Sequence, residues 1–198
     1  YKQLGFEEMD TVVKLIPGMT ETDSNAPNMP CSYCGVFRRQ GINHLAKKVN
    51  ADIMALGHNL DDMAQTVLMN MSNGDLERTL RLAPHTNTPI DGLPPRIVPL
   101  RWIPEQEVHL YAVHKNLPIH HEECPHARGA LRWRHREMVA MMEADVPGTR
   151  HGLVKMADHV KDLRNQIVDL GGHESRPSPP QECPVCGSIK KIKIFASK

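Results

Sequence analysis

The sequence predicts an α/β fold with a partial parallel sheet, and two adjoining segments carry this prediction. Residues 51–56 have the length and apolar content of a short buried strand. They run into Gly57-His-Asn-Leu-Asp-Asp62, a small and acidic turn that opens a helix. α/β enzymes hold nucleotides where strand ends meet helix starts, so we predict that Gly57, His58 and Asn59 bind a nucleotide. On spacing alone, an ordinary strand-to-helix turn with a structural His58 is the stronger explanation.

Apolar spacing and the positions of proline and glycine predict the other elements. The helix that follows the turn has Asp61 or Asp62 in its first turn and stops at Asn73-Gly74. An extended segment is expected over residues 96–103, at a sheet edge because of Pro99. Further helices are predicted over residues 5–15, from 36 to 49, and over 75–82, 105–116, 127–144 and 151–170. Two apolar faces are expected to be buried: Met63, Val67, Leu68 and Met71 in the first of these helices, and Leu153, Met156, Val160, Leu163, Ile167 and Leu170 in the last.

Charge and composition restrict the classes of partner. The chain has 198 residues and a formal net charge of +1, so any nucleic-acid surface has to be a local patch. No apolar run reaches the roughly eighteen residues of a membrane span, and no signal-peptide pattern is present. Five cysteines in such a chain favour metal or redox chemistry over a disulfide framework. We therefore expect a cytoplasmic protein.

Three cysteines form the first candidate site. Cys31 and Cys34 stand in a Cys-x-x-Cys corner before a cationic helix start, and Cys124 comes much later. Three thiolates can hold three irons of a cubane cluster and leave the fourth iron open. Zinc, or a redox disulfide between Cys31 and Cys34 with Cys124 buried, fits the spacing equally well.

A second cysteine pair lies near the end of the sequence. Cys183-Pro-Val-Cys186-Gly is half of a zinc knuckle, and structural zinc needs four ligands. His173 is one candidate for a further ligand, and a C-terminal continuation is another. An isolated surface pair is the alternative.

Arginines spaced four apart form a candidate RNA surface. Arg128, Arg132 and Arg136 share one face of the predicted helix over 127–144, and neutralising phosphates is a natural use for such a face. The alternative is a solvated face whose arginines pair with Glu137 and Glu143.

Taken together, these motifs resemble one known family. Cys31-Ser-Tyr-Cys-Gly-Val-Phe-Arg-Arg-Gln40 and Gly57-His-Asn-Leu-Asp-Asp-Met-Ala-Gln-Thr-Val-Leu-Met-Asn70 are similar to segments of the tRNA 2-thiouridine synthetases of archaea and the eukaryotic cytosol. These enzymes belong to the PP-loop ATP-pyrophosphatase superfamily. Pro95-Arg-Ile-Val-Pro-Leu-Arg101, Glu107-Val-His-Leu-Tyr-Ala112 and Glu123-Cys-Pro125 continue the likeness, which covers about residues 30–145.

The resemblance implies an adenine-nucleotide α-hydrolase-like (Rossmann-like) fold, ATP with magnesium, a 4Fe-4S cluster, and tRNA as substrate. By matching position, Cys31, Cys34 and Cys124 would be the cluster ligands. Arg38 would lie beside the cluster and the nucleotide, and Asp61 or Asp62 would be the essential acid. Cys183 and Cys186 resemble the start of the family's C-terminal zinc finger.

The same resemblance suggests a domain plan. Residues 1–125 would form the PP-loop ATPase-type domain, 126–172 a helical tRNA-binding region, 173–182 a linker and 183–198 the start of the zinc finger. The family's Ser-Gly-Gly-x-Asp-Ser phosphate loop and its N-terminal zinc finger would lie upstream of Tyr1. We therefore interpret the chain as most of a tRNA thiolase without its N-terminal part.

The implied reaction is ATP-dependent thiolation of a tRNA uridine. ATP would adenylate the C2 oxygen, and sulfide held at the open iron would then displace AMP. Phe37-Arg-Arg resembles the branch that acts on the anticodon wobble uridine. Free sulfide or a ubiquitin-like thiocarboxylate carrier would supply the sulfur, and a homodimer is possible. The alternatives are a 2-thiocytidine synthetase and a non-catalytic iron–sulfur or zinc RNA-binding subunit.

Overall fold

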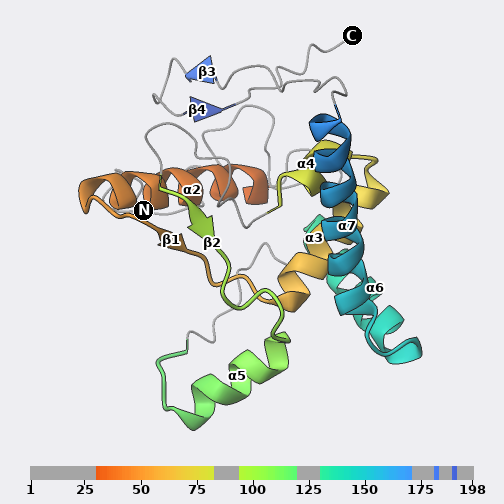
Figure 1. Cartoon of the computed structure of the whole chain (residues 1–198). Coiled ribbons are helices and arrows are strands. Elements are labelled where there is room, and N and C mark those ends of the chain that lie inside the picture. Colours follow the sequence, from red (N-terminus) through yellow and green to blue (C-terminus); the bar gives the residue numbers. More distant parts are fainter. Residues whose placement is uncertain (1–29, 83–93, 120–129, 171–180, 183–188, 191–198) are drawn as a thin grey trace, which may run out of the picture. The chain divides into compact units, whose positions relative to one another are not determined.

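The computed structural model describes residues 30–82, 94–119, 130–170, 181–182 and 189–190. This part is mostly helical, with one parallel and one antiparallel pair of short strands (Figure 1). The chain divides into two compact units, residues 1–160 and 161–198, and each is described by itself. The elements are α2 (Pro30–Lys48), β1 (Met54–Ala55), α3 (Leu60–Ser72), α4 (Leu76–Leu80), β2 (Arg96–Ile97), α5 (Glu105–His114), α6 (Leu131–Asp145), α7 (Thr149–Asp169), β3 (Gln181–Glu182) and β4 (Ile189–Lys190).

The parallel pairing of β1 and β2 confirms the predicted sheet direction. Met54 pairs with Arg96 and Ala55 with Ile97. Both strands are shorter than predicted, because the partner segment has prolines at 95 and 99 that cannot donate a backbone N–H to the ladder. The first strand is buried on one side only: Met54 is buried, whereas Ala55 is exposed.

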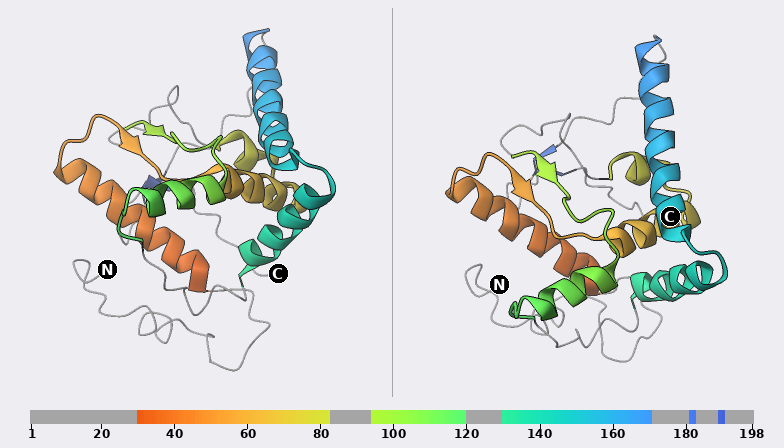
Figure 2. Two further views of the ribbon diagram at one scale, coloured as in Figure 1. Left: turned by 90° about the horizontal axis from the view of Figure 1, so that it is seen from below. Right: turned by 60° about the horizontal axis from the view of Figure 1, so that its bottom comes forward.

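The ends of both strands lead to helix starts. Beyond β1 the chain enters α3, and beyond β2 it turns and enters α5 (Figures 1 and 2). The backbone N–H of Leu60 donates to the carbonyl of Ile103 at 3.0 Å, which joins these two connections. The N-termini of α3 and α5 therefore lie together beyond the same edge of the sheet.

Helix α3 carries the described hydrophobic core. Leu60, Met63 and Ala64 pack with Val139 of α6 and Val154 of α7. Burying a side chain of this size contributes about 1.5 to 3 kcal/mol, so the core fixes α6 and the first half of α7 against α3. Leu68, Leu82 and Leu153 cover its margin.

Two predictions about buried faces need correction. Met71, in the last turn of α3, is 49% exposed. In α7 the buried residues are Val154 and Ala157, and the predicted stripe over Leu163, Ile167 and Leu170 is exposed. The helical period of apolar residues predicts that they share a face, but it does not determine whether that face meets a neighbouring element.

Helix ends agree with local sequence signals. Gly74 has φ +62°, which glycine adopts without strain, and α3 ends just before it, as predicted. Asp75 then caps α4 by accepting from the backbone N–H of Arg78. Helix α2 begins at Pro30, earlier than predicted, so both Cys31 and Cys34 lie inside the helix rather than in a corner before it.

In the second unit, β3 and β4 pair antiparallel, with Gln181 opposite Lys190 and Glu182 opposite Ile189. The predicted helix over residues 5–15 lies outside the described residues. No described helix combines the length and the hydropathy needed to cross a membrane.

Candidate functional site

The start of α3 is fixed by a capping box built from its own sequence. The side-chain oxygen of Asn59 accepts from the backbone N–H of Asp62 at 2.9 Å, and the carboxylate of Asp62 accepts from the backbone N–H of Asn59 at 3.2 Å. Both helix-start carboxylates, at Asp61 and Asp62, also face the positive end of the helix dipole. The predicted acidic helix start is therefore confirmed. Asp61 and Asp62 lie side by side in the sequence but have different surroundings.

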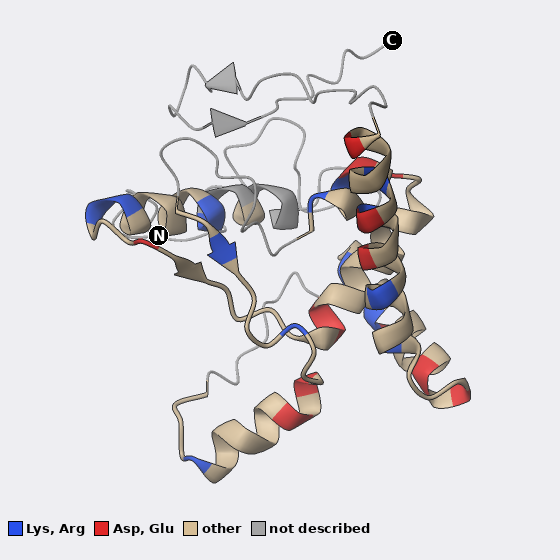
Figure 3. Ribbon diagram, in the orientation of Figure 1, with Lys and Arg blue, Asp and Glu red and all other residues tan. Residues whose placement is uncertain are grey.

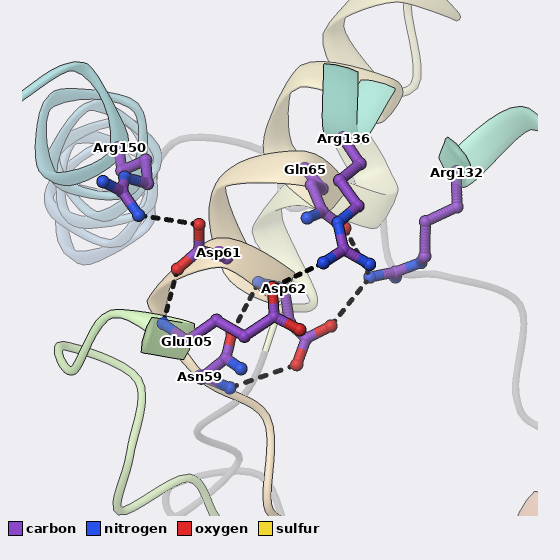
Figure 4. Close-up of polar contacts among 8 residues, drawn as sticks. All are labelled: Asn59, Asp61, Asp62, Gln65, Glu105, Arg132, Arg136 and Arg150. Carbon is purple, nitrogen blue, oxygen red and sulfur yellow. Dashed lines mark hydrogen bonds and ion pairs between the residues drawn. The ribbon is translucent and has the colours of Figure 1, made fainter. Parts of the chain in front are cut away.

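Asp61 is held in the interior of the site. Its side chain is 15% exposed, and its two oxygens accept from the backbone N–H of Glu105 at 2.7 Å and from Arg150 at 2.8 Å (Figure 4). These bonds join α3 to the start of α5 and the start of α7. Asp61 therefore fixes three elements relative to one another.

Arg150 is shared between two carboxylates. Its second partner is Glu143 in the last turns of α6, with Nε 3.4 Å from the carboxylate. Glu143 also accepts from the backbone N–H groups of Gly148 and Arg150, at 2.9 and 2.8 Å. Burial alone would raise the pKa of Glu143, but these donors and the Arg150 charge outweigh burial and hold that pKa below its ordinary value. For Arg150, burial has the opposite effect and lowers the pKa. The hydrogen bonds and charges of Asp61 and Glu143 outweigh burial and raise the pKa of Arg150 above its usual value.

Asp62 is the more accessible of the two carboxylates. Its side chain is 35% exposed and lies 3.2 Å from Arg132 of α6, which is itself 44% exposed. Arg132 also donates to the hydroxyl of Thr66 at 2.9 Å and reaches Gln65 at 3.5 Å. An exposed ion pair of this kind is weak, so a ligand can compete for either partner.

The candidate RNA arginines reach into this same region. Arg136 pairs with Glu105 at 3.2 Å (Figure 4). Its guanidinium also lies over the ring of Trp133, 5.8 Å from the ring centre. For Arg132 and Arg136 the alternative pairing with Glu137 and Glu143 is not observed, because Glu137 accepts from Trp133 and Glu143 from Arg150. Arg128 lies outside the described residues, so the predicted three-arginine face stays a prediction.

The predicted nucleotide-binding residues lie beside these carboxylates. Gly57 and His58 are exposed and connect β1 to the cap residue Asn59. Apart from its two chain neighbours, no described residue has an atom within 4 Å of the position that a Cβ on Gly57 would take. Arg38 is exposed on α2 and makes no hydrogen bond or ion pair with the α3 start among the described residues.

The cysteines are only partly described. The positions of Cys31 and Cys34 are one turn apart in α2, and Cys34 is half-buried. Cys124, Cys183 and Cys186 lie outside the described residues. Within the described ranges, no three His, Cys, Asp or Glu side chains gather closely enough to hold a metal ion, so both metal sites stay predictions.

Sequence reasoning did not place Glu105 or Arg150 in the site, and it considered Glu143 only as a partner for the arginines of the exposed face. Glu105 and Arg150 lie 44 and 89 residues from their shared partner Asp61, so no local spacing predicts these contacts. Arg101 was missed for the same reason: it donates to both carboxylate oxygens of Asp158, at 2.9 and 3.0 Å, and ties the β2–α5 connection to α7.

No protein-family model matches the sequence. Among similar proteins, the tRNA 2-thiolation protein NcsA of Haloferax volcanii is 41% identical over 167 residues, which are 80% of this chain and 50% of that protein. The cytoplasmic tRNA 2-thiolation protein 1 of Danio rerio is 37% identical over 199 residues, which are 100% of this chain and 52% of that protein.

A solved structure of a protein of the same kind is also similar to this chain. The U34-tRNA thiolase NcsA from Methanococcus maripaludis, determined with its 4Fe-4S cluster, superposes with a TM-score of 0.63 at 29% identity, covering 89% of this chain and 53% of that one. The chain is therefore a homologue of the tRNA 2-thiolation proteins over most of its own length, and it spans about half of theirs.

Proposed function

We propose that this chain forms about half of an ATP-dependent enzyme that converts a tRNA uridine, at the anticodon wobble position, to 2-thiouridine. The observation that carries the proposal is the likeness to a U34-tRNA thiolase that contains a 4Fe-4S cluster. The parallel strands with Gly57–Asn59 at their carboxyl end support the finer fold assignment, an adenine-nucleotide α-hydrolase-like domain. The relatives named cytoplasmic support the same compartment here.

The chemistry of the donor set fits a cluster. Three thiolates, from Cys31, Cys34 and Cys124, leave one iron without a protein ligand. The positions of Cys31 and Cys34 are three apart in a helix, which puts them on one face of α2. When bound, the cluster would supply a Lewis acid that keeps sulfide deprotonated near neutral pH.

The two helix-start carboxylates take different roles in this proposal. Asp62, partly exposed beside Gly57–Asn59, is the candidate to hold magnesium and the phosphates of ATP. Asp61 is enclosed by Glu105 and Arg150, so its role is to hold the helix starts in place. Arg38, exposed on the helix that carries the cysteines, is the candidate to stabilise negative charge on the nucleotide.

The end of the chain has a structural role in this proposal. Cys183 and Cys186 would begin a zinc finger, and the antiparallel strands β3 and β4 flank the segment that contains them. Residues 126–172 would contact tRNA, with 173–182 as a linker.

The test uses the complete protein that contains this chain, purified without oxygen. Incubation with unmodified tRNA, ATP and sulfide should yield 2-thiouridine at the wobble position, measured by nucleoside mass spectrometry. Omission of ATP should abolish the product. If 2-thiocytidine forms, the related synthetase is the correct assignment; tRNA binding without any thiolated nucleoside would favour a non-catalytic subunit.

A further inference from the structure

A second group of arginines differs from those at the start of α3 because, among the described residues, Arg39 and Arg96 have no carboxylate partner. Arg132 and Arg136 are engaged by Asp62 and Glu105. Within the described part of the chain, Arg39 of α2 and Arg96 of β2 make no ion pair. Figure 3 shows basic residues on α2 beside the start of β2. These positive charges are therefore available to a ligand.

Contacts between α2 and β2 bring these two arginines together. Arg96 donates to the side-chain oxygen of Asn43 at 2.8 Å, which ties β2 to α2. Asn43 lies four residues after Arg39, so both occupy one face of the helix. The Arg39 guanidinium folds back along α2, with Nη1 3.4 Å from the position that a Cβ on Gly35 would take.

The positive charges of Arg39, Arg96 and Arg78 repel one another. Partial burial lowers the pKa of Arg39, and the nearby charges of Arg96 and Arg78 lower it further. Burial also lowers the pKa of Arg96. Arginine stays protonated at neutral pH, so the folded protein holds these cations close together at a cost. Arg78 has a carboxylate partner, with its Nε 3.0 Å from Asp75, whereas neither Arg39 nor Arg96 pairs with a carboxylate of a described residue.

We propose that Arg39 and Arg96, with Arg78 at the margin, form a binding site for phosphate groups of RNA. Guanidinium groups bind phosphate through paired N–H donors, and a bound anion would relieve their repulsion. The choice of RNA as the molecule that carries these phosphate groups rests on the proposed function, in which tRNA is the substrate. Arg96 stands at the beginning of β2, whereas Gly57–Asn59 follow the end of the neighbouring parallel strand, so this site is separate from the predicted nucleotide site.

The position suits a substrate that must reach the cysteines. Arg39 lies over Gly35, the residue after Cys34. Phosphates held there would bring the adjoining nucleotides next to the helix predicted to carry the sulfur. Arg39 is exposed and Arg96 half-buried, so both are accessible to a ligand from solution.

The test measures the binding of a fluorescein-labelled anticodon stem-loop RNA to the intact chain across salt concentrations. The double variant Arg39→Gln/Arg96→Gln should lower the slope of log affinity against log salt by about 1.5 to 2, since each lost phosphate contact removes about 0.7 to 0.9. The matched control replaces two exposed cations of the same unit outside the proposed tRNA-binding region, Arg81→Gln/Lys115→Gln, and should leave the slope within about 0.5 of wild type. Equal slopes for the double variant and the wild type overturn the proposal.

A second measurement separates binding from folding and RNA from nucleotide. Arg39→Met removes one repelling charge, so it should raise the melting temperature at low salt while weakening RNA binding. A variant that loses both stability and RNA affinity overturns the proposal, because Arg39 would then be structural. ATP affinity should be unchanged in the double variant; loss of ATP binding with intact RNA binding overturns RNA as the ligand. Absence of thiolation by the complete protein, with the RNA result as expected, would contradict the proposed function alone.

Discussion

Adjacent carboxylates at the start of α3 have different partners, and this separates their roles at the scale of single residues. Asp61 meets a backbone N–H and a guanidinium, and is nearly enclosed. Asp62 meets an exposed guanidinium and its own helix cap. Removing a partner from an enclosed pair leaves a charge without compensation, whereas an exposed pair contributes little.

Asp61→Asn should lower the free energy of unfolding by about 2 to 3 kcal/mol, because Arg150 loses the nearer of its two carboxylate partners in a site with little solvent. Asp62→Asn should cost less than about 1 kcal/mol, because its pair with Arg132 is exposed. Urea denaturation of both variants measures the difference. Thiolation by the complete protein should fall at least 100-fold in Asp62→Asn, a loss that its small change in stability cannot explain. Equal destabilisation by the two variants would contradict the separation of roles.

The depressed pKa of Glu143 predicts a specific pH dependence of stability. A carboxyl whose pKa is lower in the folded than in the unfolded state stabilises the fold above its ordinary value of 4.5, and loses that contribution as the pH falls below it. Glu143→Gln should therefore be less stable than wild type at pH 7, and the difference in stability between the two proteins should narrow as the pH falls below 4.5. Urea midpoints across this range measure it. A difference in stability between variant and wild type that does not change with pH would mean that the charge of Glu143 contributes nothing to the stability of the fold.

At the scale of elements, α3 is the helix on which the others depend. Its first turn is bonded to α5, α6 and α7, and its apolar face carries the core. Its two ends are set by local sequence, a capping box at Asn59 and a left-handed glycine at Gly74.

Substitutions at the two ends of α3 should lower the free energy of unfolding by similar amounts, for different reasons. Asn59→Ala removes the cap and should cost about 1 kcal/mol. Gly74→Ala places a Cβ at φ +62° and should also cost about 1 kcal/mol. Gly57→Ala is the control, since its surroundings are open and its φ is not positive. Thermal denaturation of the three variants checks the order, and a Gly57→Ala variant as unstable as Gly74→Ala would contradict it.

At the scale of the whole molecule, the proposed reaction requires cysteines from distant parts of the chain. The complete protein, purified without oxygen, should be brown and contain about four irons, as expected for a cluster held by three thiolates. Cys124→Ala should remove the iron and colour while zinc bound through Cys183 and Cys186 is retained. Metal analysis of the variant and of Cys183→Ala, which should lose zinc but keep iron, separates the two sites. Zinc in place of iron at the first site would contradict the mechanism.

Sequence by itself determined the features that depend on near neighbours. Asn59 and Asp62 are three residues apart, so the capping box could be predicted locally, and the same is true of the stop at Gly74. The family likeness also followed from the sequence, because its motifs are contiguous runs of residues that similar proteins share.

Tertiary structure alone decided which carboxylate is enclosed and which arginines have partners. Asp61 and Asp62 are equivalent in local pattern, and only the approach of Glu105 and Arg150 distinguishes them. Likewise, Arg132 and Arg39 both belong to basic runs, yet packing brings a carboxylate to the first and another arginine to the second. Coulomb energy depends on distance in space, and the distances across elements are set by how the core packs.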